Sequence, residues 1–338
     1  MQLNGIEVLK DVNPVTYQNR KNKIQGGYAM YKWIGINADS PEKAKVNVMG
    51  IPFDGGQTQE PGAAKGPAKI REFAENFMPN ATDDWHVLDN RQIVYDFGDV
   101  NMSGTWGECF ARVEDEAMRM MKYGNFNLFL GGDHSVTIPL QKAFGRNNHG
   151  KKIGIIHFDA HMELCDCYDG KIWSHANTAK RALDDVVDAE DLLFLGIRAA
   201  EGEEVELIRR KKDITVISAT DMFHKGFSEC CQIIYNKFKD YDCLYFTLDI
   251  GVLDPAFAPA VGTPVSGGIT SRELIEFVRF IVNNLPVTDM DIVEMAPPLD
   301  VNDVTCWAAL RIIEEVFSIV DRKVEDVAEE DDLDSEIE

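Results

Sequence analysis

Carboxylate and imidazole groups gather in the segment IGIIHFDAHMELCD, residues 153–166. An apolar run ends here in Asp159, His161 and Glu163, which are spaced two residues apart. If the backbone stays extended, these three side chains project from one face. Such a face suits a metal ion, although a solvated loop start after a strand gives the same short pattern. Similar residues elsewhere in the chain favour the metal site.

Polar residues also follow or end three other apolar runs. FNLFLGG precedes Asp133, His134 and Ser135, CLYFTLDI contains Asp249, and MDIVEMAP contains Glu294. Ligands of parallel α/β sheets bind beyond the carboxyl ends of the strands, so these groups are expected to converge. A carboxylate-rich set with one or two imidazoles suits Mn²⁺, or another hard to borderline divalent ion, better than a thiolate-selected zinc.

Hydrolysis is the chemistry expected of such a set. Two ions bridged by carboxylates hold a hydroxide at neutral pH and direct it at an electrophilic carbon. The residues alone leave open whether these acids form that site or are unrelated caps and loop acids. A serine nucleophile is discounted, because the adjacent His134 and Ser135 do not form a triad and no G-x-S-x-G motif is present.

Composition restricts the partners. The chain has 338 residues, of which 45% are hydrophobic and 27% charged, with 34 Lys and Arg against 57 Asp and Glu. The formal net charge of -23 repels phosphate backbones and anionic lipid, so nucleic acid and membrane surfaces are not expected partners. No apolar run of about 18 residues or secretory signal is present, and we expect a cytoplasmic protein.

Seven cysteines without regular spacing fit reduced thiols in a cytosolic protein. Cys165 and Cys167 lie beside the candidate metal strand. A zinc site from this pair is the less favoured interpretation, because C-D-C lacks the usual ligand spacing and has no partner pair.

Strand and helix patterns alternate along the chain. Strands are predicted at 46–53, 92–100, 126–132, 152–159, 191–198, 214–219, 243–250 and 290–297. Helices are predicted at 68–77, 106–124, 136–145, 176–186, 201–211, 227–241, 271–284 and 303–323. Nearly apolar strands separated by helices imply a parallel sheet buried on both faces. We expect an α/β fold, a three-layer αβα sandwich with an eight-stranded, mainly parallel sheet, because the uneven connections suit a closed barrel less well.

The domain organisation follows from the same patterns. Residues 1–45 are expected to form an N-terminal extension that packs on the main body or a neighbouring subunit, and residues 46–323 a single domain. The acidic residues 324–338 are expected to be a disordered tail.

The chain resembles the ureohydrolase superfamily of arginases and agmatinases between about Val46 and Lys323. Five motifs occur in the family's order: GGDHSVTIP, FDAHMELCD, SHANT, TLDIGVLDPAFAPAVGTPVSGG and VEMAPPLDVNDVT. GIPFDGG with PGAAKGP, and DFGDV, are also similar to that group, and DPAFAP followed by GTP and GG is most similar to agmatinases.

The resemblance implies hydrolysis of a guanidinium group to urea and an amine by a hydroxide bridging two Mn²⁺ ions. His134 would bind the first ion and His161 the second, with Asp159 and Asp249 bridging both. Glu163 stands where the family has an aspartate that ligates the first ion and handles the proton of the bridging water.

Further roles come from the same resemblance. His175 matches a histidine proposed as a proton shuttle, and Glu294 matches the glutamate that receives the guanidinium, where two parallel charge-assisted bonds would fix its plane. The implied substrate is a small cationic guanidino compound, and the implied assembly is a homo-oligomer, a trimer or hexamer. GQTQEPGAAKG and residues 165–174 are the candidate loops for substrate selection.

Two departures from the family pattern affect the metal site. Glu163 is one methylene longer than the usual aspartate, and Gly251 replaces the second aspartate of D-x-D and offers no ligand. Ala176 and Ala64 are lesser departures, from a glycine and from an arginine. We therefore expect one firm Mn²⁺ site and a weakened second site.

Two alternatives remain beside a guanidino hydrolase. A noncatalytic relative that kept the fold would explain altered residues at both Glu163 and Gly251. A one-metal site built from Asp159, His161 and Asp249 resembles that of deacetylases on the same fold, which would cleave an acyl group without releasing urea.

Overall fold

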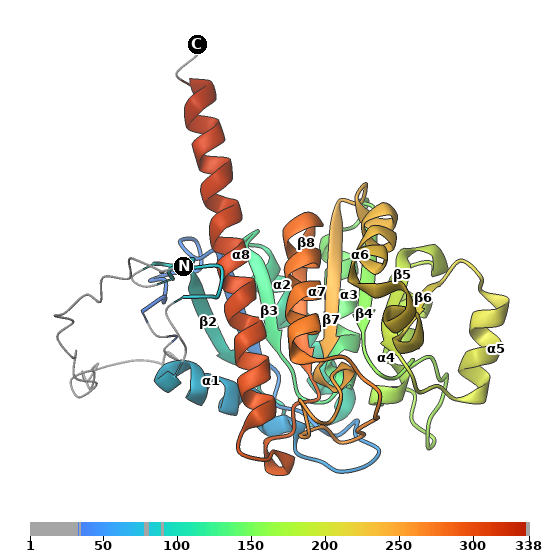
Figure 1. Ribbon diagram of the computed structural model, residues 1–338. Coiled ribbons are helices and arrows are strands. Elements are labelled where there is room, and N and C mark those ends of the chain that lie inside the picture. The colour runs from blue at the N-terminus through green and yellow to red at the C-terminus, as the bar shows by residue number, and fades with distance from the viewer. Residues whose placement is uncertain (1–32, 34, 78–80, 89–90, 336–338) are drawn as a thin grey trace, which may run out of the picture. The chain divides into compact units, whose positions relative to one another are not determined.

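A single parallel sheet forms the centre of the unit that spans Tyr31–Glu338. The structure, a computed structural model, describes residue 33 and residues 35–77, 81–88 and 91–335. Among these residues eight strands lie in the order β2-β1-β3-β8-β7-β4-β5-β6 (Figure 1). The strands are β1 Val46–Gly50, β2 Val94–Asp99, β3 Phe126–Leu130, β4 Ile153–Phe158, β5 Leu192–Ile197, β6 Thr215–Ser218, β7 Cys243–Asp249 and β8 Val287–Val293. Every pair is parallel, which confirms the predicted fold class.

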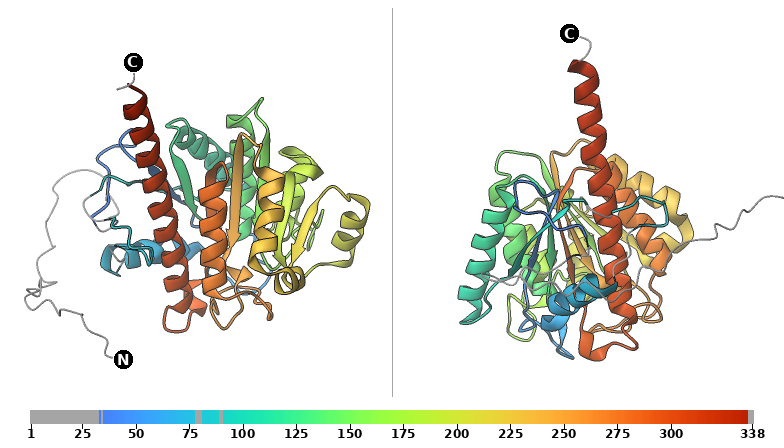
Figure 2. Two further views of the ribbon diagram at one scale, coloured as in Figure 1. Left: turned by 45° about the horizontal axis from the view of Figure 1, so that its top comes forward. Right: turned by 90° about the vertical axis from the view of Figure 1, so that its left-hand side faces the viewer.

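Helices cover both faces of the sheet (Figure 2). One layer contains α1 Gly66–Phe77, α6 Ala219–Phe238, α7 Ser271–Asn284 and α8 Val304–Ser335, whose apolar side chains share a core with strand residues such as Phe246. The other contains α2 Trp106–Met121, α3 Thr137–Asn147, α4 Thr178–Asp185 and α5 Gly202–Arg210, and shares a second core with residues such as Tyr245. Neighbouring residues of one strand thus face opposite layers, as the pleat requires.

Local signals set the start of several helices. Thr105, Ser218 and Thr270 each cap a helix and pair with an acid three residues later, which satisfies the free backbone N–H groups at both positions. The cap at Ser218 starts α6 earlier than predicted. Gly226 lies inside α6 with φ 72°, so the helix has an irregular turn there that the sequence period did not reveal.

The two ends of the chain carry the predicted N-terminal extension and the predicted acidic tail. Most of the predicted N-terminal extension lies outside the described residues, but Trp33 is fully buried, and its ring lies 5.3 Å from that of Phe317. At the other end, α8 continues to Ser335, into the acidic segment for which we expected disorder. The segment is rich in Glu and Asp and has no Pro or Gly, the two residues that break helices most strongly.

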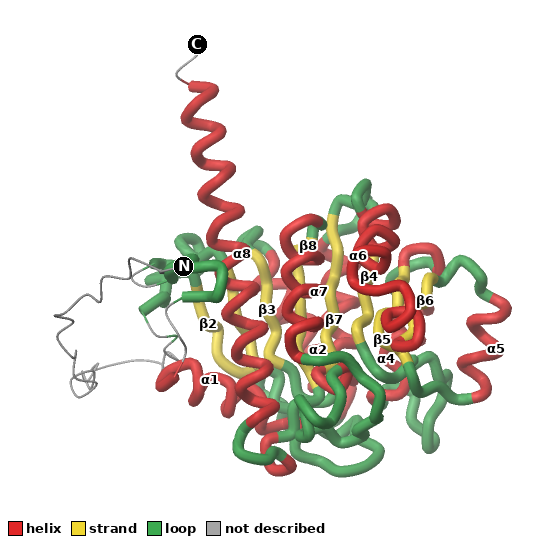
Figure 3. The backbone as a smooth tube through the Cα atoms, viewed as in Figure 1, coloured by secondary structure: helices red, strands yellow, loops and turns green. Residues whose placement is uncertain are grey.

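The connections after the carboxyl ends of the strands gather on one side of the sheet (Figure 3). All strands run in the same direction, so every strand ends at this edge. Loops at this edge are where parallel sheets carry their ligand sites.

Candidate active site

Four neighbouring strands in the middle of the sheet bring the predicted residues together. The order β3-β8-β7-β4 places the residues after each of these strands at one edge. Asp159 follows β4, Asp249 ends β7, and Glu294 follows β8. His134 begins a short 3₁₀ helix three residues after Gly131, at the end of β3. The convergence expected from the strand ends is therefore present in the fold.

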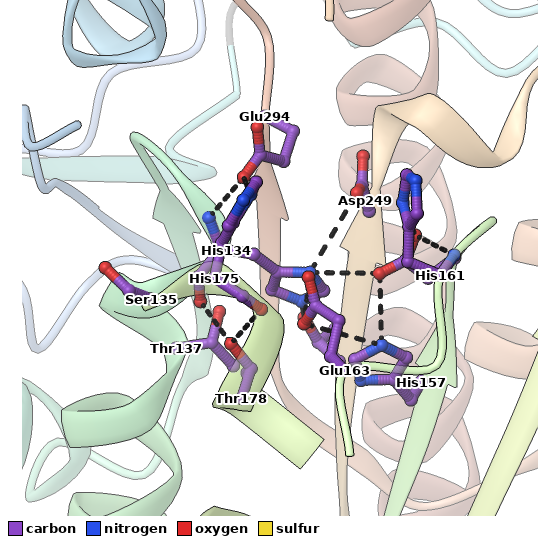
Figure 4. A network of polar contacts seen from close by, with 12 residues as sticks. His134, Ser135, Thr137, His157, His161, Glu163, His175, Thr178, Asp249 and Glu294 are labelled. Carbon is purple, nitrogen blue, oxygen red and sulfur yellow. Dashed lines mark hydrogen bonds and ion pairs between the residues drawn. The ribbon is translucent and has the colours of Figure 1, made fainter. Parts of the chain in front are cut away.

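A first group of possible metal ligands surrounds His134. Its members are all buried and their ligand atoms lie within 4.8 Å of one another: His134, His157, Asp159 and Glu163. His134 Nδ1 lies 3.2 Å from Asp159 Oδ2 and 3.0 Å from Glu163 Oε2. Figure 4 shows the side chains of His134, His157 and Glu163 pointing toward one another. The sequence did not single out His157, and it placed Asp249 in this group, whereas Asp249 Oδ2 is 3.9 Å from His134 Nδ1.

A second group consists of Asp159, His161 and Asp249. His161 Nδ1 lies 3.4 Å from Asp159 Oδ1, and the backbone N–H of His161 donates to the same oxygen. At Gly251 the chain offers only its backbone, whose N–H donates to Asp249 Oδ1 at 2.6 Å. The second group thus has three candidate ligands and the first has four.

A row of polar residues crosses β4, β7 and β8 and includes His157 of the first group. His157 is paired in register with Thr247, and Thr247 with Asp291. Thr247 Oγ1 donates to Asp291 Oδ1 at 2.6 Å and lies 2.8 Å from His134 Nε2. Because the hydroxyl proton goes to Asp291, Thr247 accepts from His134 Nε2. In the neutral ring, the proton held on Nε2 would leave the Nδ1 lone pair available to a metal ion.

The signal for this row was present in the sequence. His157 and Thr247 each stand two residues before Asp159 and Asp249, so the strand period of two places them on the same face of the sheet. Asp291 occupies the matching position in β8. Each is a polar residue within a mostly apolar run, which is why attention to the strand ends missed them.

His175 and Glu294 form a pair beside the first group. His175 Nδ1 lies 3.1 Å from Glu294 Oε1, which also accepts from the backbone N–H of His134 at 2.8 Å. Burial opposes protonation of His175, but the bond to Glu294 outweighs it and raises the pKa of His175 to about 9. His175 Nε2 lies 2.8 Å from Thr58 Oγ1, so the charged ring has an acceptor there.

Two of these acids have backbones in the left-handed region. Glu163 has φ 53° and Glu294 has φ 67°. Residues other than Gly, Asn and Asp adopt this backbone conformation at a cost of about 1 kcal/mol or more. Residues in this conformation cluster at functional sites.

The buried acids lack enough positive charge. Burial raises the pKa of Asp249 well above its usual value, and the nearby Asp159 adds to the rise. Burial also opposes ionisation of Asp159, but the neighbouring His134 ring and the hydrogen bond with His157 hold its pKa well below the usual value. Burial lowers the pKa of His134, and the charges of Glu163 and Asp159 overcome this effect and raise it well above 6.5. A cation would satisfy this cluster.

The donor set fits a divalent metal ion. His134 Nδ1 and Glu163 Oε2 are buried, and neither has a hydrogen-bond partner among the described residues. Two atoms 3.0 Å apart without hydrogen-bond geometry are what a shared ion between them would explain. The mixture of carboxylate oxygens and imidazole nitrogens suits Mn²⁺, Fe²⁺ or Zn²⁺.

A cavity of about 450 Å³ opens beside this centre. Its walls include His161, Glu163 and His175 from the candidate site, and Tyr168 and Thr58 from the two predicted substrate loops. Both loops therefore lie where a bound small molecule would touch them.

Known proteins share this architecture. The model of the arginase family matches residues 44–318. The chain is 32% identical to an agmatinase from Bacillus anthracis over 281 residues, covering 82% of this chain and 92% of that protein. It is 30% identical to a guanidinobutyrase from Pseudomonas aeruginosa, covering 80% and 85%.

Solved structures share the fold of this chain. The agmatine ureohydrolase of Thermoplasma volcanium superposes with a TM-score of 0.78 at 25% identity, covering 88% of this chain and 97% of that one. Among the described helices, none combines the length and apolar character that crossing a membrane requires. The family model, the curated relatives and the shared fold together show that the chain belongs to the arginase family.

Proposed function

We propose that the protein hydrolyses a carbon–nitrogen bond of a guanidino compound, with water as co-substrate and urea and an amine as products. The observation that carries the proposal is the buried acid and imidazole cluster next to the His175–Glu294 pair and the cavity. Relatives named agmatinase and guanidinobutyrase support the same reaction class.

The metal is assigned to residues whose donors fit it. His134, His157, Asp159 and Glu163 would hold one ion, and Asp159 with His161 and Asp249 a second. A bound divalent cation supplies Lewis acidity, which makes water a nucleophile at neutral pH. We propose Mn²⁺ as the ion, held firmly in the first group and weakly in the second because Gly251 provides no side chain.

Glu294 and His175 are proposed to act on the organic substrate. A guanidinium presents parallel N–H groups, and the Glu294 carboxylate is proposed to accept two of them and so fix the plane of the reacting carbon. His175 carries a proton at neutral pH and is proposed to give it to the departing nitrogen as the bond breaks. Its Nε2 contacts Thr58, a wall residue of the cavity, so the proton lies at the substrate side.

The cavity wall favours a substrate with a second positive group. Glu201 and Glu204 both line it, and although Glu204 already accepts from the backbone N–H groups of Leu164 and Glu201, the two carboxylates keep this wall negative. Arg198 also lies there, but its guanidinium donates to backbone carbonyls such as those of Gly251 and Val265, so these donors are not available to a carboxylate tail. We therefore propose agmatine, with its terminal amine, over guanidinobutyrate, with its terminal carboxylate.

Urea release tests the proposal. Purified protein with its metal is assayed on agmatine, arginine and guanidinobutyrate, and bound metal is counted by elemental mass spectrometry. Urea from agmatine, with more than one ion per chain only at high Mn²⁺ concentration, is the expected result. Metal-free protein that releases no urea from any guanidine would refute the proposal. Release of acetate from an acylated polyamine, without urea, would replace it by a deacetylase.

Assembly and location are proposed from the resemblance to the family. We propose a homo-oligomer, a trimer or hexamer, in the cytoplasm. The seven cysteines form no disulfide, which agrees with a reducing compartment. Light scattering during size-exclusion chromatography measures the assembly, and a monomer at micromolar concentration would contradict the proposed oligomer.

A further inference from the structure

Gln57 is hydrogen-bonded to Glu294, the carboxylate that we propose binds the substrate guanidinium. Gln57 Nε2 donates to Glu294 Oε2 at 2.5 Å across 237 residues of chain. The other oxygen, Glu294 Oε1, accepts from the backbone of His134 and from His175 Nδ1. Glu294 is 2% exposed, so these three donors enclose its carboxylate.

The Gln57 amide is held in one orientation. With its oxygen turned inward, two acceptors would meet at Glu294 Oε2, which is repulsive. Gln57 is 9% exposed, and its Oε1 has no hydrogen-bond partner among the described residues. A buried amide that satisfies only its donor half gives up part of its hydrogen bonding to remain on Glu294.

The backbone around Gln57 is fixed, while its side chain is the part that can move. The N–H of Gly56 donates to Asp133 Oδ2 at 2.7 Å, and the carbonyl of Gly56 accepts from the N–H of His175. A Cβ at Gly56 would lie 2.4 Å from Ser135 Oγ, so the loop packs closely there. A rotation about the side-chain bonds of Gln57 needs no change in these contacts.

Access to Glu294 depends on that rotation. The cavity is lined by Thr58 and Gln59, the two residues that follow Gln57, but Gln57 and Glu294 are not among its described wall residues. A guanidinium that enters the cavity therefore meets the carboxylate only after one of its donors leaves. The backbone N–H of His134 is fixed, and His175 is held between Glu294 and Thr58, which leaves Gln57.

We propose that Gln57 is an affinity-determining residue, a built-in stand-in for the substrate guanidinium that occupies Glu294 until the substrate displaces it. The inference rests on the proposed function, because it takes Glu294 as the guanidinium site. A guanidinium offers two parallel charged donors and replaces the single neutral donor of Gln57. A simple ammonium offers no parallel pair and displaces it less well, so Gln57 also selects against amines.

Binding of guanidinium ion tests the inference without requiring turnover. Isothermal titration calorimetry with guanidinium chloride compares metal-loaded wild type with Gln57→Leu, which keeps the volume and removes the amide. Since a hydrogen bond to a charged group contributes roughly a factor of ten or more, Gln57→Leu is expected to bind guanidinium about tenfold more tightly. For a turned-over substrate, KM should fall by a similar factor with kcat nearly unchanged.

Gln141→Leu is the matched control. Gln141 is a buried glutamine of α3 whose amide has no hydrogen-bond partner among the described residues, and its replacement should leave guanidinium affinity unchanged. Gln57→Ala repeats the test if the leucine variant does not fold. Equal or weaker guanidinium binding in the Gln57 variants than in wild type would overturn the inference. Tighter binding without urea release from any guanidine would support the displaced amide while refuting the proposed reaction.

Discussion

Replacing Thr247 by valine should weaken metal binding while the fold is retained. Valine has the shape of threonine without the hydroxyl, so packing is retained. The change removes the 2.6 Å bond to Asp291 and the 2.8 Å contact with His134 Nε2. A hydrogen bond to a buried charge contributes about 1.5–3 kcal/mol, and a buried unpaired donor costs about 1–3 kcal/mol. Thr247→Val should therefore lower the free energy of unfolding by about 3–5 kcal/mol.

The larger consequence concerns the tautomer of His134. Without an acceptor at Nε2, the neutral ring gains by moving its proton to Nδ1, which lies 3.0 Å from Glu163 and 3.2 Å from Asp159. A metal must then displace that proton. Loss of a residue that orients a ligand typically lowers metal affinity about 10–100-fold, and we expect a change of this size.

Competition with a chromogenic chelator measures the metal affinity, and denaturant titration measures the free energy of unfolding. Thr288→Val is the matched control, because Thr288 donates at 2.7 Å to another buried acid of β8, Asp289, that lies outside both ligand groups. Thr247→Ser keeps the hydroxyl and should bind metal as wild type does. Equal metal affinity in Thr247→Val and Thr288→Val would refute the reasoning.

Three other predictions follow from the site. In Glu163→Asp/Gly251→Asp, we expect two ions per chain by elemental mass spectrometry where wild type holds one; because a Cβ at position 251 would lie 2.9 Å from Asp249 Oδ1, that carboxylate must shift slightly. Urea release that appears only in this variant would mark wild type as noncatalytic, and two ions in wild type would contradict the weakened site. His175 has a folded pKa of about 9 against 6.5, so its stabilisation of about 3 kcal/mol is fully present below pH 6.5 and lost as pH rises through 9. Unfolding measured across pH 6–10 should show this loss in wild type and not in Glu294→Gln; parallel curves would contradict it. Removing the metal with a chelator should lower the thermal midpoint, since an ion at about 1,000 times its Kd stabilises by about 4 kcal/mol, and an unchanged midpoint would mean that no ion was bound.

Much of the fold was readable from local patterns, because each strand and helix carries its own apolar period. The alternation of elements and the polar strand ends at Asp159 and Asp249 follow from neighbours in sequence. The order of the strands in the sheet could not be predicted in this way. β4 lies beside β7 rather than β3, and no local pattern encodes that choice. It is the pairing that aligns His157 with Thr247.

The parts of the site that escaped prediction depend on contacts over long sequence distances. Gln57 and Glu294 are hydrogen-bonded although they lie 237 residues apart in the chain, and the sequence of the Gly-rich loop around Gln57 does not indicate a buried amide. The continuation of α8 to Ser335 was not predicted for another reason. The many acidic residues of this segment indicated disorder, although they are compatible with a helix. Departures such as Gly251 were visible in sequence, but their geometric effect on Asp249 was not.

The candidate metal ligands come from β3, β4 and β7, and this placement has a consequence for how the protein folds. His134 and Asp249 are far apart in the chain, and β8, which lies between β3 and β7, is the last strand in sequence. A complete set of ligands exists only when these long-range pairings have formed, so an ion cannot guide the slow search for them. Metal uptake should come after sheet assembly, leaving the folding rate unchanged and slowing unfolding. Cells short of the metal would accumulate folded, unloaded protein that is ready to accept an ion.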